Sequence, residues 1–142
     1  MDETAERTTI QLRDLCGGRS GDKGDAFNIG VIARAPHYLP YIRAALTEAR
    51  VMAFFAHEFE GASHPEVRRY EVPGLDALNL HLTQSLGGGQ MATLRLDALA
   101  KGKAQQLLDC PVPVPPDVFA QLDPALREKA GLSYDELSRG IL

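Results

Sequence analysis

Two adjoining stretches decide the fold of this chain: Cys16-Gly17-Gly18-Arg19-Ser20-Gly21-Asp22-Lys23-Gly24-Asp25 and Phe27-Asn28-Ile29-Gly30-Val31-Ile32-Ala33. The second stretch alternates apolar residues on one side with mostly apolar residues on the other, which is typical of a strand near the centre of a sheet. The first contains four glycines within eight residues, together with two cations, two carboxylates and a hydroxyl. So many positions without a Cβ indicate a loop that bends sharply or lies against another group. We therefore expect a glycine-rich binding loop that leads into a central strand.

The residue types of the predicted loop allow more than one ligand. Its backbone N–H groups, with Arg19 and Lys23, could surround a phosphate or a carboxylate, such as a phosphate of coenzyme A. Asp22 and Asp25 could instead bind a hard cation through oxygen, although two carboxylates are too few to define a metal site. In a purely structural loop these carboxylates would accept hydrogen bonds from the backbone. The candidate ligand-binding residues here are Arg19, Ser20, Gly21, Asp22, Lys23, Gly24 and Asp25.

Periodicity along the rest of the chain predicts alternating strands and helices. The predicted strands cover residues 9–15, 27–33, 67–72, 77–83 and 110–114, and the predicted helices cover residues 41–59 and 94–108. Charged residues make strand 67–72 an edge strand, and prolines place strand 110–114 at an edge as well. Beyond Pro115 and Pro116, two short helical pieces are expected over residues 123–129 and 133–141.

Apart from the first strand, this order is β-α-β-β-α-β, the split βαβ arrangement of ferredoxin-like α/β folds. Right-handed crossovers place strands 27–33 and 77–83 side by side at the centre of the sheet, with both helices on one face. Leu78, Leu80 and Leu82 then point toward the helices. The open face is the expected place for a ligand or a partner. It carries Asn79, His81 and Thr83, near Asn28 and Arg34.

The length predicts one folded domain. A chain of 142 residues buries enough surface to fold without a metal or a disulfide. Its two cysteines, Cys16 and Cys110, make no disulfide framework. We expect a disordered N-terminus over residues 1–8, a folded domain over residues 9–114 and a helical tail over residues 115–142. The tail could pack on its own domain or reach across to another subunit.

Charge and hydropathy argue against two classes of partner. The net charge is −4 and no long run of either sign occurs, whereas non-specific nucleic-acid binding needs a basic stripe. The acidic, polar start of the chain is unlike a signal peptide, and no apolar run approaches the roughly 20 residues that span a bilayer. We expect a soluble cytoplasmic protein that binds neither nucleic acid nor a membrane.

Residues outside the predicted loop, and Asp25 within it, could also carry chemistry. Gly87-Gly88-Gly89 would admit close approach of a ligand or a partner backbone, or form a flexible connection. His81 and Asp25 are candidate general bases, although a hydrogen-bonded histidine at a subunit interface is the commoner arrangement. The histidines match no zinc spacing, and the loop has neither P-loop nor Rossmann order, so we predict no metal and no cofactor. Cys16 is expected to be a buried structural thiol.

Several phrases in the sequence resemble the C-terminal domain of the acyclic terpene utilization protein AtuA family, which also occurs as a stand-alone AtuA-like chain. The resemblance implies a ferredoxin-like α/β domain. In longer relatives the domain follows a much larger N-terminal domain, and these relatives are associated with breakdown of branched, terpene-derived or short acyl-CoA compounds. The resemblance covers residues 9–112 and rests on Arg19-Ser20-Gly21-Asp22-Lys23-Gly24-Asp25 with Asn28-Ile29-Gly30, Tyr70-Glu71-Val72-Pro73 with Ala77-Leu78-Asn79-Leu80, Leu86-Gly87-Gly88-Gly89, and Leu94-Arg95-Leu96-Asp97 with Lys101-Gly102-Lys103.

Three functions are compatible with these features. The first is a non-catalytic accessory subunit that works with a separately encoded large AtuA-like protein in acyl-CoA or terpenoid-derived catabolism. The second is a small enzyme acting on an acyl-CoA or a carboxylic acid, with His81 or Asp25 as base and Arg19 or Lys23 as anion clamp. The third is a homo-oligomer that binds a small anion. Open sheet faces are usually covered, so we expect a homo- or hetero-oligomer. The predicted ligand-binding residues outside the loop are Asn28, Asn79, Gly87, Gly88 and Gly89.

Overall fold

The computed structural model describes residues 7–122 and contains a four-stranded antiparallel sheet. Its strands lie in the order β2-β3-β5-β4. The two central strands, β3 and β5, are antiparallel neighbours, with Ile29 opposite Leu80. The bounds of the four strands are Cys16–Lys23 for β2, Ala26–Ala33 for β3, Val67–Val72 for β4 and Ala77–Leu82 for β5.

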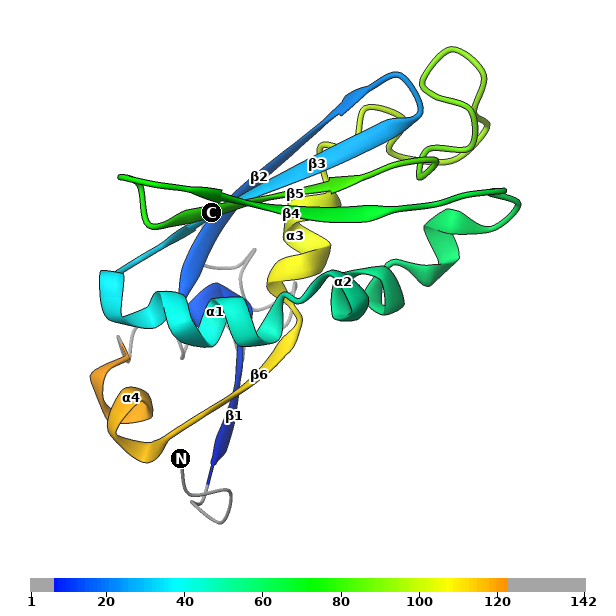
Figure 1. Cartoon of the computed structure of the whole chain (residues 1–142). Helices are drawn as coiled ribbons and strands as arrows, with labels where there is room; N and C mark the ends of the chain where they lie inside the picture. Colours follow the sequence, from blue (N-terminus) through cyan, green and yellow to red (C-terminus); the bar gives the residue numbers. More distant parts are fainter. Residues whose placement is uncertain (1–6, 123–142) are drawn as a thin grey trace, which may run out of the picture.

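Helices cover one face of this sheet, and the opposite face carries no described helix (Figure 1). The predicted helix over residues 41–59 is divided into shorter pieces, because Leu46 leaves the helical conformation and Thr47 starts a new helix as its N-cap. The helical elements are η2 (Pro36–Tyr38), α1 (Leu39–Ala45), α2 (Glu48–Phe54), η3 (Ala56–Phe59) and α3 (Lys103–Leu108).

A second, two-stranded sheet lies on the helical side of the molecule, below the helices in Figure 1. It pairs β1 (Thr8–Gln11) with β6 (Pro111–Val114) in antiparallel register. The 3-10 helix η1 (Leu12–Asp14) connects β1 to β2, and α4 (Pro116–Gln121) follows β6. The proline-containing strand predicted over residues 110–114 is therefore at an edge, as predicted, but it pairs with β1 in a separate two-stranded sheet.

The core lies between the four-stranded sheet and the helices. Leu78, Leu80 and Leu82 of β5 are fully buried on the helical side, as the alternation predicted. Phe27 of β3 meets Phe55 edge to face, with ring centroids 5.3 Å apart. Each fully buried side chain of this size contributes roughly 1.5–3 kcal/mol to folding. The α/β class with antiparallel sheets agrees with the sequence prediction.

Two predicted elements are wrong in detail. The glycine-rich stretch, expected as a loop, forms strand β2 and pairs with β3 along its whole length. The predicted helix over residues 94–108 begins only at Lys103. Asp97 and Ala100 have positive φ angles of 60° and 57°, which an α-helix does not accept. The predicted helical pieces over residues 123–129 and 133–141 lie outside the described residues.

Candidate functional site

The glycine-rich stretch does not form the converging loop that an anion cradle would need. In an extended strand, successive N–H groups point to opposite edges instead of converging on one ligand atom. The side chains also diverge. Arg19, Gly21 and Lys23 lie on the open face, opposite Gly30, Asn28 and Ala26 of β3. Ser20 and Asp22 lie on the helical side, so the predicted group over residues 19–25 is divided between the two faces.

Two residues of β2, Gly18 and Ser20, allow helix α3 to pack closely against the sheet. The Ser20 hydroxyl donates to the Ala100 carbonyl at 2.5 Å and accepts from the Ala104 amide at 3.0 Å. A Cβ on Gly18 would lie 3.5 Å from the Ala104 Cβ and 3.3 Å from the Gly30 carbonyl oxygen. The second distance is tighter than most real Cβ contacts. Part of the glycine and serine content of β2 is thus explained by close packing of helix on strand.

Asp25 and Gly87-Gly88-Gly89 lie together, as parts of a structural clamp. Asp25 Oδ1 accepts from the Gly88 amide at 2.8 Å and from the Leu86 amide at 3.1 Å. Gly89 has φ +97°, and a Cβ there would lie 2.7 Å from the Gly24 carbonyl oxygen. Glycine is required at this position by both conformation and space. The Asp25 carboxylate is therefore engaged with the backbone and is poorly placed to act as a base.

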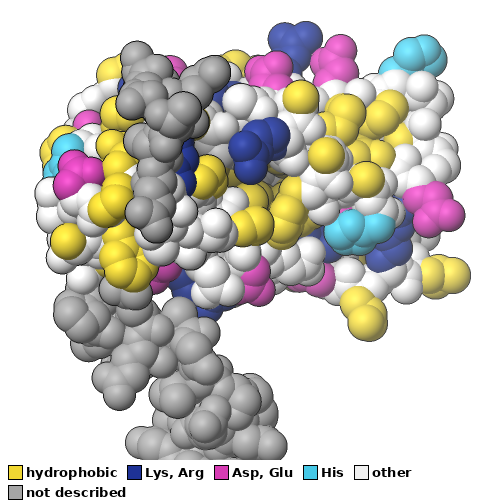
Figure 2. Space-filling model, turned by 90° about the horizontal axis from the view of Figure 1, so that it is seen from below, with side chains coloured by type: hydrophobic (Ala, Val, Ile, Leu, Met, Phe, Trp, Pro, Cys, Tyr) yellow, Lys and Arg dark blue, Asp and Glu magenta, His cyan; other side chains and the backbone are white. Residues whose placement is uncertain are grey.

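The clamp holds the start of a long connection, residues 83–102, which we call the apolar loop. It extends from the end of β5 past the turn between β2 and β3 (Figure 1). Met91 and Leu96 are 94% and 93% exposed, and Leu94 is fully exposed. Hydrophobic side chains project from the right-hand end of the molecule in Figure 2, the end where Figure 1 draws the loop. Sequence reasoning assigned these leucines to a helix and missed their exposure.

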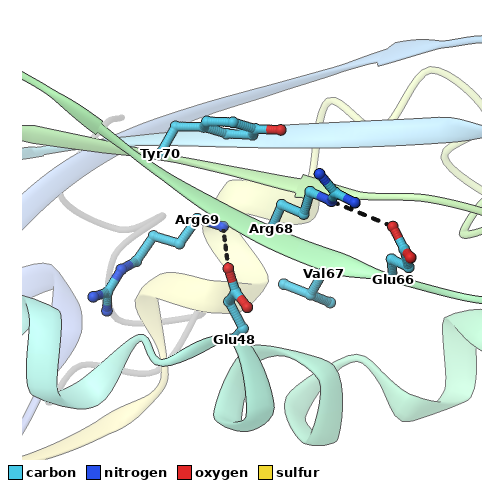
Figure 3. Close-up of a pocket in the computed structure, with 6 residues that line it drawn as sticks. All are labelled: Glu48, Glu66, Val67, Arg68, Arg69 and Tyr70. Atoms are coloured by element: carbon cyan, nitrogen blue, oxygen red, sulfur yellow. Dashed lines mark hydrogen bonds and ion pairs between the residues drawn. The ribbon is translucent and has the colours of Figure 1, made fainter.

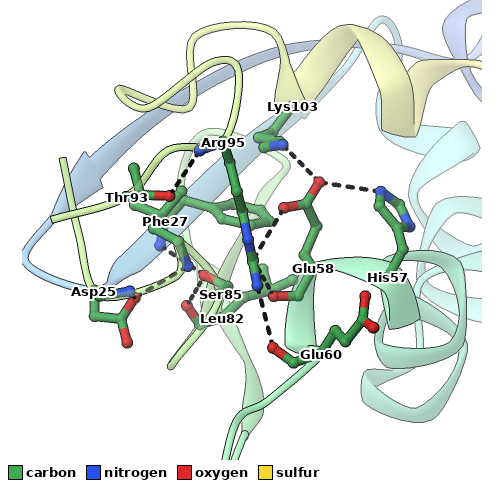
Figure 4. Close-up of polar contacts among 12 residues, drawn as sticks. Asp25, Phe27, His57, Glu58, Glu60, Leu82, Ser85, Thr93, Arg95 and Lys103 are labelled. Carbon is green, nitrogen blue, oxygen red and sulfur yellow. Dashed lines mark hydrogen bonds and ion pairs between the residues drawn. The ribbon is translucent and has the colours of Figure 1, made fainter.

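Polar side chains between the leucines fix the loop to the domain (Figure 4). Arg95 donates to the Glu58 carbonyl at 2.6 Å and to the Glu60 carbonyl at 3.1 Å. Asp97 Oδ2 accepts from the Gly102 amide at 3.0 Å. Leu94-Arg95-Leu96-Asp97 thus alternates exposed leucines with anchored polar residues. That alternation of period two was the available sequence signal against a helix here.

A buried ion pair lies beneath the loop. Lys103 and Glu58 are 3% and 8% exposed, and their Nζ and Oε1 atoms are 2.7 Å apart. His57 Nε2 approaches the same carboxylate oxygen at 3.0 Å (Figure 4). A cavity of about 410 Å³ adjoins this group, lined in part by Arg95 and Leu96. Because Glu58 faces Lys103 and Arg95, its charge is compensated within the protein, and the group serves to join η3, α3 and the loop.

The open face collects the remaining predicted site residues. Asn28 Nδ2 donates to Asn79 Oδ1 at 2.9 Å, which confirms the predicted proximity of these two side chains. His81 lies in the same cross-strand row as Asn28 and Arg68. It makes no hydrogen bond or ion pair with the described residues, so no neighbouring group orients it as a base. The guanidinium of Arg34 turns away and donates to the Arg13 carbonyl.

A cavity of about 500 Å³ lies along the outer edge of β4. Figure 3 shows that the Arg69 amide, which points away from the sheet, donates to Glu48 Oε1; the distance is 3.0 Å. The carboxylate occupies the acceptor position that an added strand would use, and so protects this edge. Arg69 also donates to the Arg43 and Leu46 carbonyls. The residues that line this cavity therefore serve to protect the edge of β4.

Burial affects the reactivity of the Cys16 thiol. Burial raises the pKa of Cys16 to about 12, against a smaller opposing effect of Arg34. Such a thiol is a poor nucleophile at neutral pH. Within residues 7–122, no three His, Cys, Asp or Glu side chains gather into a group that could hold a metal ion. The helices in that range are also too short or too polar to cross a membrane.

Comparison with known protein families gives a match. Residues 10–113 match the AtuA ferredoxin-like domain family. This is most of the chain, and the chain belongs to that family. The resemblance seen in the sequence is therefore confirmed, and with it the ferredoxin-like class of the domain. No curated protein and no solved structure matches the chain.

Proposed function

We propose that this chain is an accessory subunit that binds a large AtuA-like protein through its apolar loop, in cytoplasmic acyl-CoA or terpenoid-derived catabolism. The observation that carries the proposal is the exposure of Met91, Leu94 and Leu96 on a loop whose backbone is anchored. Large apolar side chains gathered in this way on a surface mark interaction sites.

The shape of the loop favours a protein over a small ligand. Small-molecule sites are concave and bury most of the ligand, whereas these side chains project outward. Leu94 and Leu96 are both almost completely exposed, and Arg95 between them is anchored to the domain. A groove on a protein partner that accepts two apolar side chains fits this arrangement.

The hydrogen bonds that anchor the loop favour tight binding, because they fix its conformation in the unbound chain. Arg95 is bonded to two carbonyls at the end of η3, and Asp25 holds two amides near the loop's start. A segment already held in its bound shape loses less conformational entropy on association. The resemblance to longer AtuA-like relatives, in which this domain follows a much larger one, supports a large AtuA-like protein as the partner.

The test is co-expression of the chain with the large AtuA-like protein of the same source, followed by affinity capture and a measured Kd. Replacing both leucines, Leu94→Ser with Leu96→Ser, should weaken binding at least about a hundredfold, because each buried leucine contributes roughly 1.5–3 kcal/mol. Leu75→Ser is the matched control, since Leu75 is an exposed leucine in the turn at the other end of β5. An unchanged Kd for the double variant, or no complex with the wild-type chain, would refute the proposal.

A further inference from the structure

The open face of the sheet is a second surface, and the cross-strand register defines what it presents. Residues paired across neighbouring strands project on the same side, so each set of paired residues forms one row. Ile32 and Tyr70 are 54% and 48% exposed on this face. Three complete rows follow from the pairing: Gly21–Asn28–His81–Arg68, Arg19–Gly30–Asn79–Tyr70, and Gly17–Ile32–Ala77–Val72. Beyond the first row, Lys23 lies beside Ala26, and Thr83 beside Glu66.

At two positions on this face, neither packing nor backbone conformation within the monomer requires glycine. A Cβ on Gly17 would have no neighbour within 4 Å, and one on Gly30 would only touch the Arg19 carbonyl oxygen at 4.0 Å. Neither residue has a positive φ. Glycine within a strand lowers stability by roughly 0.5–1 kcal/mol relative to alanine. A bare strand surface of this kind marks close approach by another molecule.

We propose that the open face binds the same face of a second copy of this chain, about a two-fold axis that runs along the strands between β3 and β5. This axis places β2 over the partner's β4 and β3 over the partner's β5. Each row then lies over the same row of the second copy. The two sheets stack as in aligned sheet packing, in which the strand directions differ by about 30°.

The two faces are complementary in size under this operation. Gly30 lies over the partner's Asn79, and Gly17 lies over the partner's Val72. In both contacts a side chain of one copy meets a glycine of the other. Alternation of large and small residues is what allows two layers to interdigitate without voids.

The charges and polar groups are complementary as well. Lys23 lies over the partner's Glu66, and Arg19 lies over the partner's Tyr70, where a guanidinium can stack on the ring. Asn28 lies over the partner's His81, a pair that can share a hydrogen bond. Arg68 lies over the partner's Gly21 beside Lys101, and its ion pair with Glu66 at 3.3 Å offsets that repulsion.

The area is sufficient for a specific dimer. Four strands and four rows cover about 500 Å² on each copy, given the usual strand and residue spacings. Two such faces reach the roughly 1,000 Å² from which specific interfaces begin. The exposed side chains of the apolar loop, Met91, Leu94 and Leu96, are not among the rows of this face, so the dimer and the complex with the large AtuA-like protein do not depend on each other.

The test is the mass of the purified full chain in solution, measured by sedimentation and light scattering between about 1 and 200 μM. The wild type should form a dimer with a Kd in the micromolar range. Gly30→Gln should fold normally and raise that Kd at least tenfold, because its side chain enters the space of the partner's Asn79. Ala53→Gln is the control, since Ala53 is exposed on α2 on the helical side.

A charge exchange tests the direction of the axis. Lys23→Glu should weaken the dimer, and adding Glu66→Lys should restore most of the lost affinity, because the two positions face each other. With the axis across the strands, Lys23 would instead lie over the partner's Gly17, and the second change could not rescue the first. A wild type that stays monomeric, a dimer indifferent to Gly30→Gln and Lys23→Glu, or a missing rescue would each overturn the proposal.

Discussion

Glu58 and Lys103 form a buried ion pair that joins the end of the helical layer to the first residue of α3, with Nζ and Oε1 2.7 Å apart. The ammonium group also lies 5.8 Å from the centroid of the Phe27 ring. The backbone carbonyl of the same glutamate accepts from Arg95. One residue of η3 therefore fixes both the middle of the apolar loop and the helix into which the loop leads.

Removing one member of this pair should be far more harmful than removing both. Lys103→Met leaves the Glu58 carboxylate buried without its closest cation, and we expect a loss of about 3 kcal/mol in the free energy of unfolding. The double change Glu58→Leu with Lys103→Met should recover most of that loss. Urea unfolding of the wild type, of Lys103→Met, of Glu58→Leu and of the double variant measures both effects. Losses that simply add would show that the two charges do not interact in the folded state.

Most of the sheet could be predicted from the sequence because its strands carry a strong period-two pattern. In β5, Leu78, Leu80 and Leu82 are buried, while Asn79 and His81 reach the open face. The adjacency of β3 and β5 followed from ordinary connection rules, and the Asn28–Asn79 hydrogen bond confirms it.

The glycine-rich strand could not be predicted, because glycine has low strand propensity. The contacts that require glycine in this strand come from residues far away in the sequence. Gly18 makes room for Ala104 of a helix more than 80 positions away in the sequence. Gly17 and Gly30 leave bare a face that the monomer does not use. The helix predicted from Leu94 failed for a related reason. The spacing of Leu94, Leu96 and Leu99 resembles the buried stripe of a helix, although the structure leaves Leu94 and Leu96 almost completely exposed.

Two glycine replacements should distinguish a glycine that the backbone conformation requires from one that lies on an open surface. Gly89→Ala should lower the free energy of unfolding by about 3 kcal/mol, because of the positive φ and the 2.7 Å approach to the Gly24 carbonyl oxygen. Gly17→Ala should leave it unchanged or raise it by up to roughly 1 kcal/mol. Equilibrium denaturation of monomeric protein at low concentration provides the comparison. Equal destabilisation by both variants would contradict the assignment of Gly17 to an external surface.

The clamp at Asp25 should control the order of the apolar loop. Asp25→Ala removes the acceptor of the Gly88 and Leu86 amides, and we expect a loss of about 1–3 kcal/mol. Amide hydrogen exchange at residues 86–89 should become faster by at least tenfold. Asp22→Ala is the control, since the Asp22 side chain accepts no loop amide among the described residues. Unchanged exchange in the Asp25 variant would mean that other contacts fix the loop.

The buried thiol of Cys16 should make the protein less stable in alkali. The pKa of Cys16 is raised to about 12 in the folded chain by burial, while an unfolded cysteine ionises near 8.5. The stabilising contribution of the protonated thiol is therefore complete below the unfolded pKa and declines as the pH rises toward 12. Between pH 9 and pH 10 this single group should remove about 1 kcal/mol from the free energy of unfolding. Cys16→Ala should flatten that decline relative to wild type in paired urea titrations, whatever its effect at pH 7. A thiol reagent at pH 8 should label Cys16 only after unfolding, and rapid labelling of the native chain would show that the thiol is accessible.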